Sequence, residues 1–335
     1  MSPQIPFHRW QRRLTRGRIW YTMYFKIQFF EWIRIRLMIV RIADQAGFCF
    51  GVKRALELIH GLRNEGRDIQ VLGELIHNQS VLSDLARKGV ACIRDRLAAD
   101  PAKTLVIRTH GIPAGEEAEL REAGFQLLDA TCPLVKKTHC IIERFEQQGI
   151  PVVIVGDRNH PEIIAASSYA TNPIIVNSRE EALAVPRMPV MGVVAQTTLD
   201  LDFFREIEAI LAGRAQRLEV HNTVCDATRE RQEAVRRLAP QVDCVVVIGG
   251  RNSSNTGKLV RIAKRHNPRT LHIEGSAALD DPAFHDWLAD CRSVGIAAGA
   301  STPPDEIEKV ENFVSAYNPK PATRLDIDQR RMHHG

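Results

Sequence analysis

Three cysteines recur in one register, and this internal repeat limits the fold more than any other feature of the sequence. Cys49, Cys132 and Cys225 are each followed by a glycine 24 positions later and by a histidine or serine 28 positions later. These partners are Gly73, Gly156 and Gly249, and then His77, His160 and Ser253. Self-similar spacing indicates repeated structural units, and a chain of 335 residues has room for three of them.

Each repeat has the pattern of a helix followed by strands. The helix-like segments after the cysteines are residues 52–59, 135–142 and 229–235. The short apolar segments that follow them are residues 69–72, 152–155 and 245–248, and a second set, each before a polar loop, is residues 104–107, 191–194 and 294–297. Alternating strands and helices predict parallel sheets with helices packed on them. We therefore expect an α/β fold of three pseudo-repeated units with small parallel sheets around one central site.

The unit boundaries are expected near residues 132 and 222. The predicted parts of the chain are an N-terminal extension, residues 1–37, three α/β units, residues 38–132, 133–221 and 222–315, and a C-terminal tail, residues 316–335. The strand-like segment that begins at Met38 reads as the start of the first unit.

The first 37 residues differ in composition from the rest of the chain. They contain eight Lys or Arg, a single acid and nine of the aromatic residues, and without them the formal net charge of +5 becomes −2. A nucleic-acid-binding function is therefore not expected, because its basic surface should lie on the folded part. Three explanations of the extension stay open: a targeting peptide, an amphipathic membrane-surface segment, or an upstream start that is not translated, which Met38 favours.

The cysteine count and the hydropathy indicate the compartment. Seven cysteines, an odd number, occur without a recognisable secretory signal, so reduced thiols and a cytoplasmic location are expected. Organellar import stays open because of the extension. No run of eighteen apolar residues is present, so no transmembrane segment is predicted.

Three cysteines at equivalent repeat positions are expected to converge. Three thiolates leave one open position on a tetrahedral metal, or one iron without a protein ligand in a cubane cluster, and the spacing does not decide between these metals. The alternative is that Cys49, Cys132 and Cys225 are ordinary buried residues. The remaining four cysteines lie in apolar or helical contexts and are expected in the core: Cys92, Cys140, Cys244 and Cys291.

Polar residues that follow the predicted strands suit the binding of an anion. In the first two units these are His77, His110 and His160, and in the third unit hydroxyl and amide side chains fill the corresponding places: Ser253, Ser254, Asn255 and Ser301. Neutral donors converging from several loops form an anion site.

Two further polar residues have the chemistry for proton transfer. Glu162 shares a loop with His160, and a carboxyl group in a closed site has a raised pKa and can deliver protons. Thr197 ends an apolar strand, where its hydroxyl group can relay a proton or hold a substrate oxygen.

Two nucleotide-binding motifs are excluded. The segment 249–259 has glycines too far apart for a phosphate-binding loop, and Leu259 stands where a Ser or Thr is needed. No Gly-x-Gly-x-x-Gly motif follows the first strand, so no nicotinamide cofactor is predicted.

Together these motifs closely resemble the LytB family, the 4-hydroxy-3-methylbut-2-enyl diphosphate reductases. The resemblance covers about residues 38–315, and its carriers are Gly47-Phe48-Cys49-Phe50-Gly51-Val52, Glu74-Leu75-Ile76-His77-Asn78, Thr109-His110-Gly111, Asp129-Ala130-Thr131-Cys132-Pro133, His160-Pro161-Glu162, Gln196-Thr197-Thr198, Ser253-Ser254-Asn255 and Gly299-Ala300-Ser301. The combination of motifs is specific, whereas any one of them alone is weak.

The resemblance implies the cofactor, the reaction and the role of each site residue. It implies one 4Fe-4S cluster with three cysteine ligands, Cys49, Cys132 and Cys225, in an oxidoreductase of the non-mevalonate pathway. The substrate, an allylic diphosphate, would be converted to isopentenyl diphosphate and dimethylallyl diphosphate, with electrons from a donor such as ferredoxin or flavodoxin. The implied catalytic residues are Glu162, which supplies protons, and Thr197 near the substrate hydroxyl. The implied diphosphate-binding residues are His77, His110, His160, Ser253, Ser254, Asn255 and Ser301.

Two other functions use the same residues. A zinc-dependent hydrolase or lyase would bind zinc and a water molecule with the three thiolates. An iron-sulfur sensor would hold a cluster without turning over a substrate, but this function does not explain the neutral donors arranged for an anion.

Overall fold

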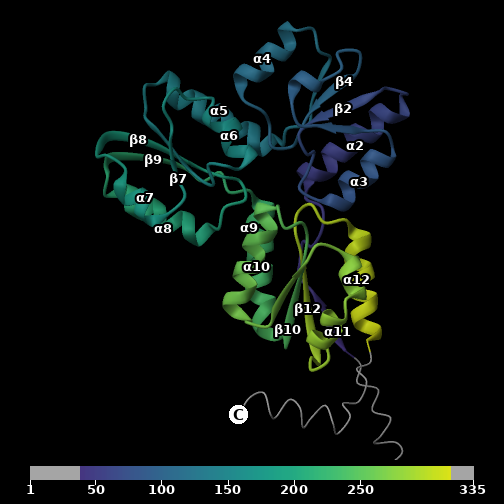
Figure 1. The fold of residues 1–335 in the computed structure, drawn as a ribbon. Coiled ribbons are helices and arrows are strands. Elements are labelled where there is room, and N and C mark those ends of the chain that lie inside the picture. Colours follow the sequence, from purple (N-terminus) through teal and green to yellow (C-terminus); the bar gives the residue numbers. More distant parts are fainter. Residues whose placement is uncertain (1–37, 318–335) are drawn as a thin grey trace, which may run out of the picture.

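The computed structural model describes residues 38–317. The predicted extension, residues 1–37, and residues 318–335 of the predicted tail lie outside the described residues. The described part contains three four-stranded sheets in which all strand pairs are parallel. Figure 1 shows them as three lobes that meet at the centre of the molecule. The prediction of an α/β fold with three small parallel sheets is confirmed.

The first lobe contains a sheet with the strand order β3-β2-β4-β5. Its elements are β2 (Ile69–Leu72), β3 (Ala91–Ile93), β4 (Thr104–Ile107) and β5 (Leu127–Asp129), with the helices α2 (Phe50–Asn64), α3 (Gln79–Arg87) and α4 (Ala114–Glu122). The two central strands, β2 and β4, are buried along their whole length. Their continuous apolar sequences follow from this position, because helices cover both faces of a parallel sheet.

The second lobe repeats this arrangement with the strand order β7-β6-β8-β9. Its elements are β6 (Val152–Val155), β7 (Ile174–Val176), β8 (Met188–Ala195) and β9 (Ala215–His221), with the helices α5 (Pro133–Gln147), α6 (Pro161–Ser167), α7 (Arg179–Ala184) and α8 (Leu201–Ala212). The apolar face of α5 packs on this sheet, and its Phe145 is fully buried with residues of β6 and β8.

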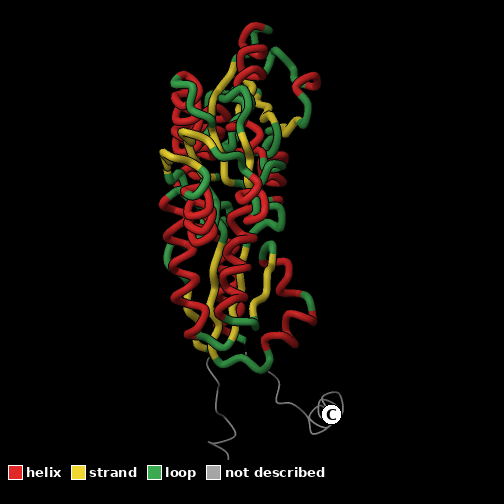
Figure 2. Tube along the Cα trace, turned by 90° about the vertical axis from the view of Figure 1, so that its left-hand side faces the viewer, coloured by secondary structure: helices red, strands yellow, loops and turns green. Residues whose placement is uncertain are grey.

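The third lobe takes one strand from the beginning of the described chain. The strand order of its sheet is β1-β12-β10-β11. The strands are β1 (Ile39–Ile42), β10 (Cys244–Ile248), β11 (Thr270–Ile273) and β12 (Ser293–Ala298). The helices are α9 (Asp226–Leu238), α10 (Ser254–His266), α11 (Pro282–Leu288) and α12 (Pro304–Ala316). Figure 2 shows these strands along the long axis of the molecule, with helices on both sides. In the described chain, 3-10 turns lie at Arg96–Ala98, Ala239–Gln241 and Ser276–Asp280.

The position of β1 differs from the predicted division of the chain. Its place in the sequence predicts that β1 belongs to the first unit, residues 38–132, but it pairs with β12 in the third sheet, where Val40 lies opposite Val294. The next residues, 43–49, lead across to the first lobe. Pairing with β12 buries Met38 in the core of the third lobe, so the third sheet gains a fourth strand that local sequence does not predict.

The expected places of the other four cysteines need correction. Cys92 and Cys140 are exposed, not in the core, because one lies on an edge strand and the other on the outer face of α5. Cys244 and Cys291 are buried as expected, but they form a disulfide, with Cα atoms 6.5 Å apart. The prediction of reduced thiols is wrong for this pair, since β10 and β12 are neighbours in the sheet and bring the two sulfurs together.

The strands of all three sheets direct their following loops toward the meeting point of the lobes. In open parallel sheets, ligands bind at these loops, beyond the carboxyl ends of the strands. Among residues 38–317, no helix has the length and apolar character needed to cross a membrane.

Candidate functional site

Each of the three repeat cysteines is the N-cap residue of a helix. Cys49 precedes α2, Cys132 precedes α5 and Cys225 precedes α9. All three are free thiols, and they line one pocket between the lobes. The N-terminus of a helix carries a partial positive charge, which stabilises a thiolate. The structure therefore brings the three cysteines of the repeat together, each beside a helix N-terminus that can offset part of the charge of a thiolate.

Backbone hydrogen bonds between the lobes fix all three of these helix starts. The Cys49 N–H group donates to Ala300 O at 3.0 Å, which joins the first lobe to the third. The Cys225 N–H group donates to Thr197 O at 3.0 Å, which joins the third lobe to the second. The Cys132 N–H group donates to Thr109 O at 2.9 Å, which joins the second lobe to the first. The cysteines converge because each helix start is bonded to a loop that follows a strand of another lobe.

The surroundings of the cysteines fit a metal cluster. A Cβ atom added at Gly51 would lie 2.9 Å from Cys132 Sγ and 3.9 Å from Cys49 Sγ, so the glycine keeps space beside both sulfurs. Burial raises the pKa of the Cys132 and Cys225 thiols, which therefore need a cation to become thiolates. Three sulfur ligands suit a zinc ion with one open position or an iron-sulfur cluster with one iron free of protein ligands.

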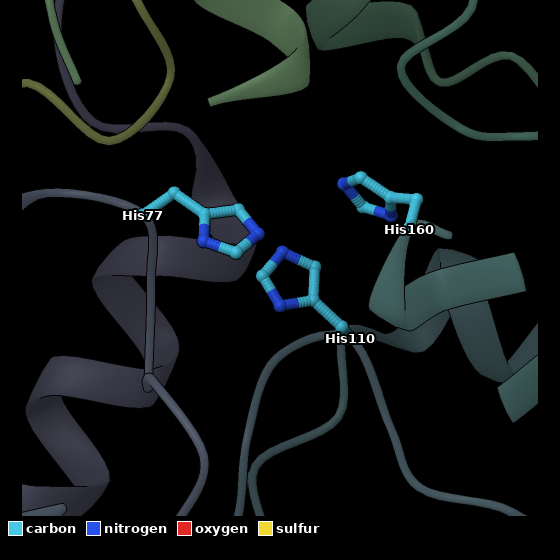
Figure 3. A group of neighbouring side chains, drawn as sticks. All are labelled: His77, His110 and His160. Atoms are coloured by element: carbon cyan, nitrogen blue, oxygen red, sulfur yellow. The ribbon is translucent and has the colours of Figure 1, made fainter. Parts of the chain in front are cut away.

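The three predicted histidines lie together in the same pocket (Figure 3). The rings of His77 and His110 stack with their centroids 4.5 Å apart. The His160 ring lies edge-on to both, at centroid distances of 5.7 Å from His77 and 5.3 Å from His110. One ring nitrogen of each lies within 4.8 Å of the others. This spacing suits three donors to one anion, and it also suits three ligands of one metal ion.

The protonation of the histidines indicates which nitrogens can donate. Burial first, and then the neighbouring His77, lowers the pKa of His160 to about 4 and that of His110 well below its usual value. The Glu162 N–H group donates to His160 Nδ1 at 3.1 Å, so the neutral His160 ring carries its proton on Nε2. His77 Nδ1 lies 3.0 Å from Glu74 Oε2, and within the described residues its buried Nε2 atom has no partner.

The start of α10 and the loop after β12 add hydroxyl and amide groups. Ser253 is the N-cap of α10, and its Oγ accepts from the Thr256 N–H group at 3.3 Å. Both polar side-chain atoms of Asn255 are buried without a hydrogen-bond partner in the described part of the chain. Ser301 Oγ donates to His77 O at 3.1 Å. A helix N-terminus with an unpartnered amide favours an anion over a metal ion in this part of the pocket.

Glu162 and Thr197 form a buried pair. Glu162 is 2% exposed, and burial raises its pKa above the usual value for a carboxyl group, although two hydrogen bonds from Thr197 oppose the shift. The Thr197 N–H group donates to one carboxyl oxygen at 2.6 Å, and Thr197 Oγ1 donates to the other at 2.8 Å. Burial favours the protonated form of this carboxyl group, and its contact with the Thr197 hydroxyl group offers a route for a proton toward a bound ligand.

All of the predicted site residues line this one pocket. They are Cys49, Cys132, Cys225, His77, His110, His160, Glu162, Thr197, Ser253, Ser254, Asn255 and Ser301. The three lobes each supply a cysteine and at least one polar group, as the repeat register indicates.

Other polar residues in or behind the pocket were not singled out from the sequence. Thr198 and Thr228 line it, and their position next to predicted residues was the available signal. Arg231 is 4% exposed, and its guanidinium group donates to Gly47 O at 2.7 Å. Lys258 is 8% exposed on the inner face of α10. The burial of these two cations cannot be predicted from the sequence, because charged residues on an amphipathic helix normally lie on its solvent-exposed face.

Comparisons with known proteins agree with the geometry. The family model described as LytB protein matches residues 40–315. A 4-hydroxy-3-methylbut-2-enyl diphosphate reductase of Citrifermentans bemidjiense is 40% identical over 282 residues, which cover 84% of this chain and 98% of the relative.

Two solved structures share the arrangement of the chain. One is a structure of (E)-4-hydroxy-3-methyl-but-2-enyl diphosphate reductase, described as the terminal enzyme of the non-mevalonate pathway. It is 39% identical, with a TM-score of 0.61 and coverage of 84% of this chain and 100% of the other. The second, a reductase from Plasmodium falciparum, is 24% identical, with a TM-score of 0.78 and coverage of 88% and 98%, and it bears on the fold alone.

Proposed function

The chain belongs to the LytB family of 4-hydroxy-3-methylbut-2-enyl diphosphate reductases, and from this premise we propose how its central pocket performs the reaction. The enzyme is an oxidoreductase of the terminal step of the non-mevalonate pathway. The substrate gains two electrons and two protons and loses its hydroxyl group as water, which gives isopentenyl diphosphate and dimethylallyl diphosphate. The reaction therefore needs an electron source, a proton source and an anion site in one closed space.

One observation carries this proposal: three cysteines and a set of neutral hydrogen-bond donors, each set drawn from all three lobes, line the same pocket. A zinc site for hydrolysis would need the three thiols but not the donors. An iron-sulfur sensor would need neither the donors nor the buried acid beside them. A reductase acting on a diphosphate uses the whole arrangement.

The three cysteines would hold one 4Fe-4S cluster. Cys49, Cys132 and Cys225 are its ligands in this proposal, and Gly51 leaves space beside two of the sulfurs. When bound, the cluster supplies low-potential electrons and one iron free of protein ligands. The helix N-termini at the three cysteines offset part of the negative charge of the thiolates.

The diphosphate group would lie among the histidines and the start of α10. His160 offers a proton on Nε2, and the unpartnered Asn255 amide supplies another donor. Neutral donors bind the anion by hydrogen bonds without fixing a counter-charge next to the reacting carbon. The remaining donors of the site are His77, His110, Ser253, Ser254 and Ser301.

Glu162 would deliver protons through Thr197. Burial keeps the carboxyl group protonated to higher pH than usual, and Thr197 Oγ1 lies 2.8 Å from it. The Thr197 hydroxyl group lines the pocket, where it can contact the substrate hydroxyl. The substrate hydroxyl group leaves as water only after it gains a proton, so this pair controls the loss of water.

An external protein must supply the electrons, and we propose a ferredoxin or flavodoxin as the donor. The cytoplasmic location stays a prediction, and cell fractionation would test it.

The deciding experiment is anaerobic purification followed by iron and sulfide analysis and turnover with a strong chemical reductant. We expect about four irons and four sulfides per chain, and conversion of the substrate to both products. A colourless, air-stable zinc protein would support the hydrolase instead. A protein with a full cluster but without turnover would support the sensor.

A further inference from the structure

The start of α10 holds a buried lysine that has no function in the reaction described so far. Lys258 is 8% exposed, and its Nζ atom donates to Ser254 Oγ at 2.9 Å. A charged group is stable in the interior of a protein only when it is paired. The identity of the charge that pairs with Lys258 is therefore a question about function.

Glu162, Asp200 and Asp157 lie near enough to raise the pKa of Lys258, but within residues 38–317 none of them forms an ion pair with it. Asp157 Oδ1 accepts from the Asn159 N–H group at 3.0 Å. Asp200 forms ion pairs with Arg236 at 3.6 Å and Arg265 at 3.7 Å. Glu162 is bonded to Thr197 through both oxygens. Among residues 38–317, the hydrogen bond to Ser254 is the contact that the Lys258 ammonium group makes, and Ser254 is neutral.

Ser254 connects this lysine to the pocket. Its Oγ also lies 3.3 Å from Gln196 Nε2, and the Gln196 amide is oriented because its Oε1 accepts from the Asp157 N–H group at 3.0 Å. Lysine and amide nitrogens only donate, so together they occupy both lone pairs of the Ser254 oxygen. Thr198 Oγ1 is a further donor to Ser254 Oγ, at 3.1 Å, so the Ser254 hydroxyl proton is left for a ligand in the pocket that both residues line.

The charge of Lys258 also reaches the proposed diphosphate site. After burial and His77, it is a further cause of the lowered pKa of His160, and it opposes the raised pKa of Glu162. Among the other donors of the pocket, burial lowers the pKa of His110 and of His160 and so favours their neutral form. A diphosphate carries several negative charges, and Lys258 places a buried positive charge in direct contact with Ser254, one of the donors that line the pocket.

We propose that Lys258 is a positioning residue of the diphosphate site, which holds Ser254 as a hydrogen-bond donor and supplies positive charge to the bound diphosphate. This inference rests on the proposed function of the pocket. Lys258 does not touch the substrate, and it acts through Ser254. An ammonium group without an ion-pair partner lowers the stability of the free protein. A bound anion would supply that partner.

The test measures binding of inorganic diphosphate to the full chain, purified anaerobically, by calorimetry at neutral pH. In K258M the dissociation constant should rise about ten- to a hundredfold, as expected for loss of a charge-assisted contact. K258R should recover most of the affinity. The matched control is K264M, which removes an exposed lysine of the same helix and should bind like the parent.

A second readout separates positioning from a structural role. Removing an unpaired buried charge should leave the thermal midpoint of the free protein unchanged or raise it, while the affinity falls. A purely structural lysine would lower both together. In turnover, KM should rise with little change in kcat, because the lost contact acts on bound substrate and transition state alike.

A double-mutant cycle tests the route through Ser254. In an S254A background, K258M should cost much less affinity than in the parent, because the two residues act as one unit. Losses that simply add would overturn the route.

The pH dependence gives an independent check. Burial, and after it the charge of Arg261, lowers the pKa of Lys258 to about 8. The nearby acids Glu162, Asp200 and Asp157 oppose this shift. Above that pH the lysine loses its charge, so the affinity of the parent should fall relative to K258R, whose guanidinium group stays charged.

The outcomes distinguish the inference from the proposed function. If the parent binds diphosphate and K258M binds it equally well, the inference is wrong and the proposed function stands. If the parent itself binds no diphosphate, both are wrong. A rise in the dissociation constant with an unchanged thermal midpoint supports both.

Discussion

At the scale of single residues, burial decides the chemistry of the pocket. It raises the pKa values of Glu162 and of the Cys132 and Cys225 thiols, and it lowers that of His160 to about 4. Each shift favours the neutral form, since a charge loses its hydration when it is buried. These side chains therefore favour their neutral forms in the free protein. An anionic substrate and a metal cluster would bring charge into the pocket when they bind.

The cysteine assignment predicts a sharp division among single substitutions. Cys49→Ser, Cys132→Ser or Cys225→Ser should each greatly reduce the iron content and abolish most of the turnover, because serine oxygen is a poor ligand for an iron-sulfur cluster. Cys140→Ser is the matched control, since this thiol is exposed on α5. Iron and sulfide analysis of anaerobically purified protein checks the result. Full iron content in Cys225→Ser would remove that residue from the ligand set.

The role of Glu162 predicts a defect in turnover without a defect in binding. Glu162→Gln cannot donate a proton readily, so turnover should fall by about 10²- to 10⁴-fold. The raised pKa also fixes the sign of the pH dependence. The acid works while it is protonated, so turnover of the parent should fall as the pH rises through that pKa, and this limb should vanish in Glu162→Gln. Turnover within about threefold of the parent would assign proton delivery to another group.

At the scale of elements, the helix starts form the site. The N-cap residues of α2, α5 and α9 are the three cysteines, and those of α6 and α10 are His160 and Ser253. Five helix N-termini that face one pocket place positive partial charge around it. These helix starts offset part of the negative charge that bound phosphates or metal-bound thiolates would bring to the pocket.

The packing of α2 against the start of α5 predicts the effect of one added methyl group. In Gly51→Ala the Cβ atom would lie 2.9 Å from Cys132 Sγ, so the sulfur must move and cluster retention should fall severalfold. The helix itself should not suffer, since alanine favours a helix more than glycine does. Gly61→Ala is the control in the same helix, because nothing lies within 4 Å of its added Cβ. Iron content should fall only in the first variant, with equal helical circular dichroism in both, and equal iron contents would contradict the close approach.

At the scale of the whole molecule, contacts between segments far apart in the sequence join the three lobes. β1 completes the sheet of the third lobe, and Arg231 of α9 donates to Gly47 O in the segment that leads to the first lobe. The third lobe is therefore the part that ties the chain together. The pocket lies where the three lobes meet, so its geometry depends on all of them (Figure 1).

The position of β1 predicts where the chain can be shortened. A chain that starts at Met38 should fold and turn over like the full-length protein, because every element and motif of the site lies beyond that residue. A chain that starts at Ala43 lacks β1 and should lose thermal stability, since β12 becomes an edge strand and the Met38 contact with the core is lost. Thermal unfolding and turnover of the two chains check this. An insoluble or inactive chain from Met38 would show that residues 1–37 are structural.

The sequence by itself determined the α/β class, the three units and the set of pocket residues. The strands 69–72, 104–107 and 152–155 appear with the predicted bounds. These features could be predicted because each is local: apolar runs mark buried strands, and a register repeated three times in the chain places equivalent residues at equivalent loops. The nature of the metal was not contained in the spacing, because three thiolates suit zinc and an iron-sulfur cluster alike.

Only the tertiary structure decided which distant segments meet. It placed β1 in the third sheet, joined Cys244 to Cys291, and buried Lys258 behind Ser254. None of these follows from a local pattern, because strand pairing, disulfide pairing and the burial of one charged helix face all depend on what packs against the element. The physical reason is that hydrophobic periodicity indicates which face of a helix or strand is buried. Which other element packs against that face depends on the packing of the whole chain.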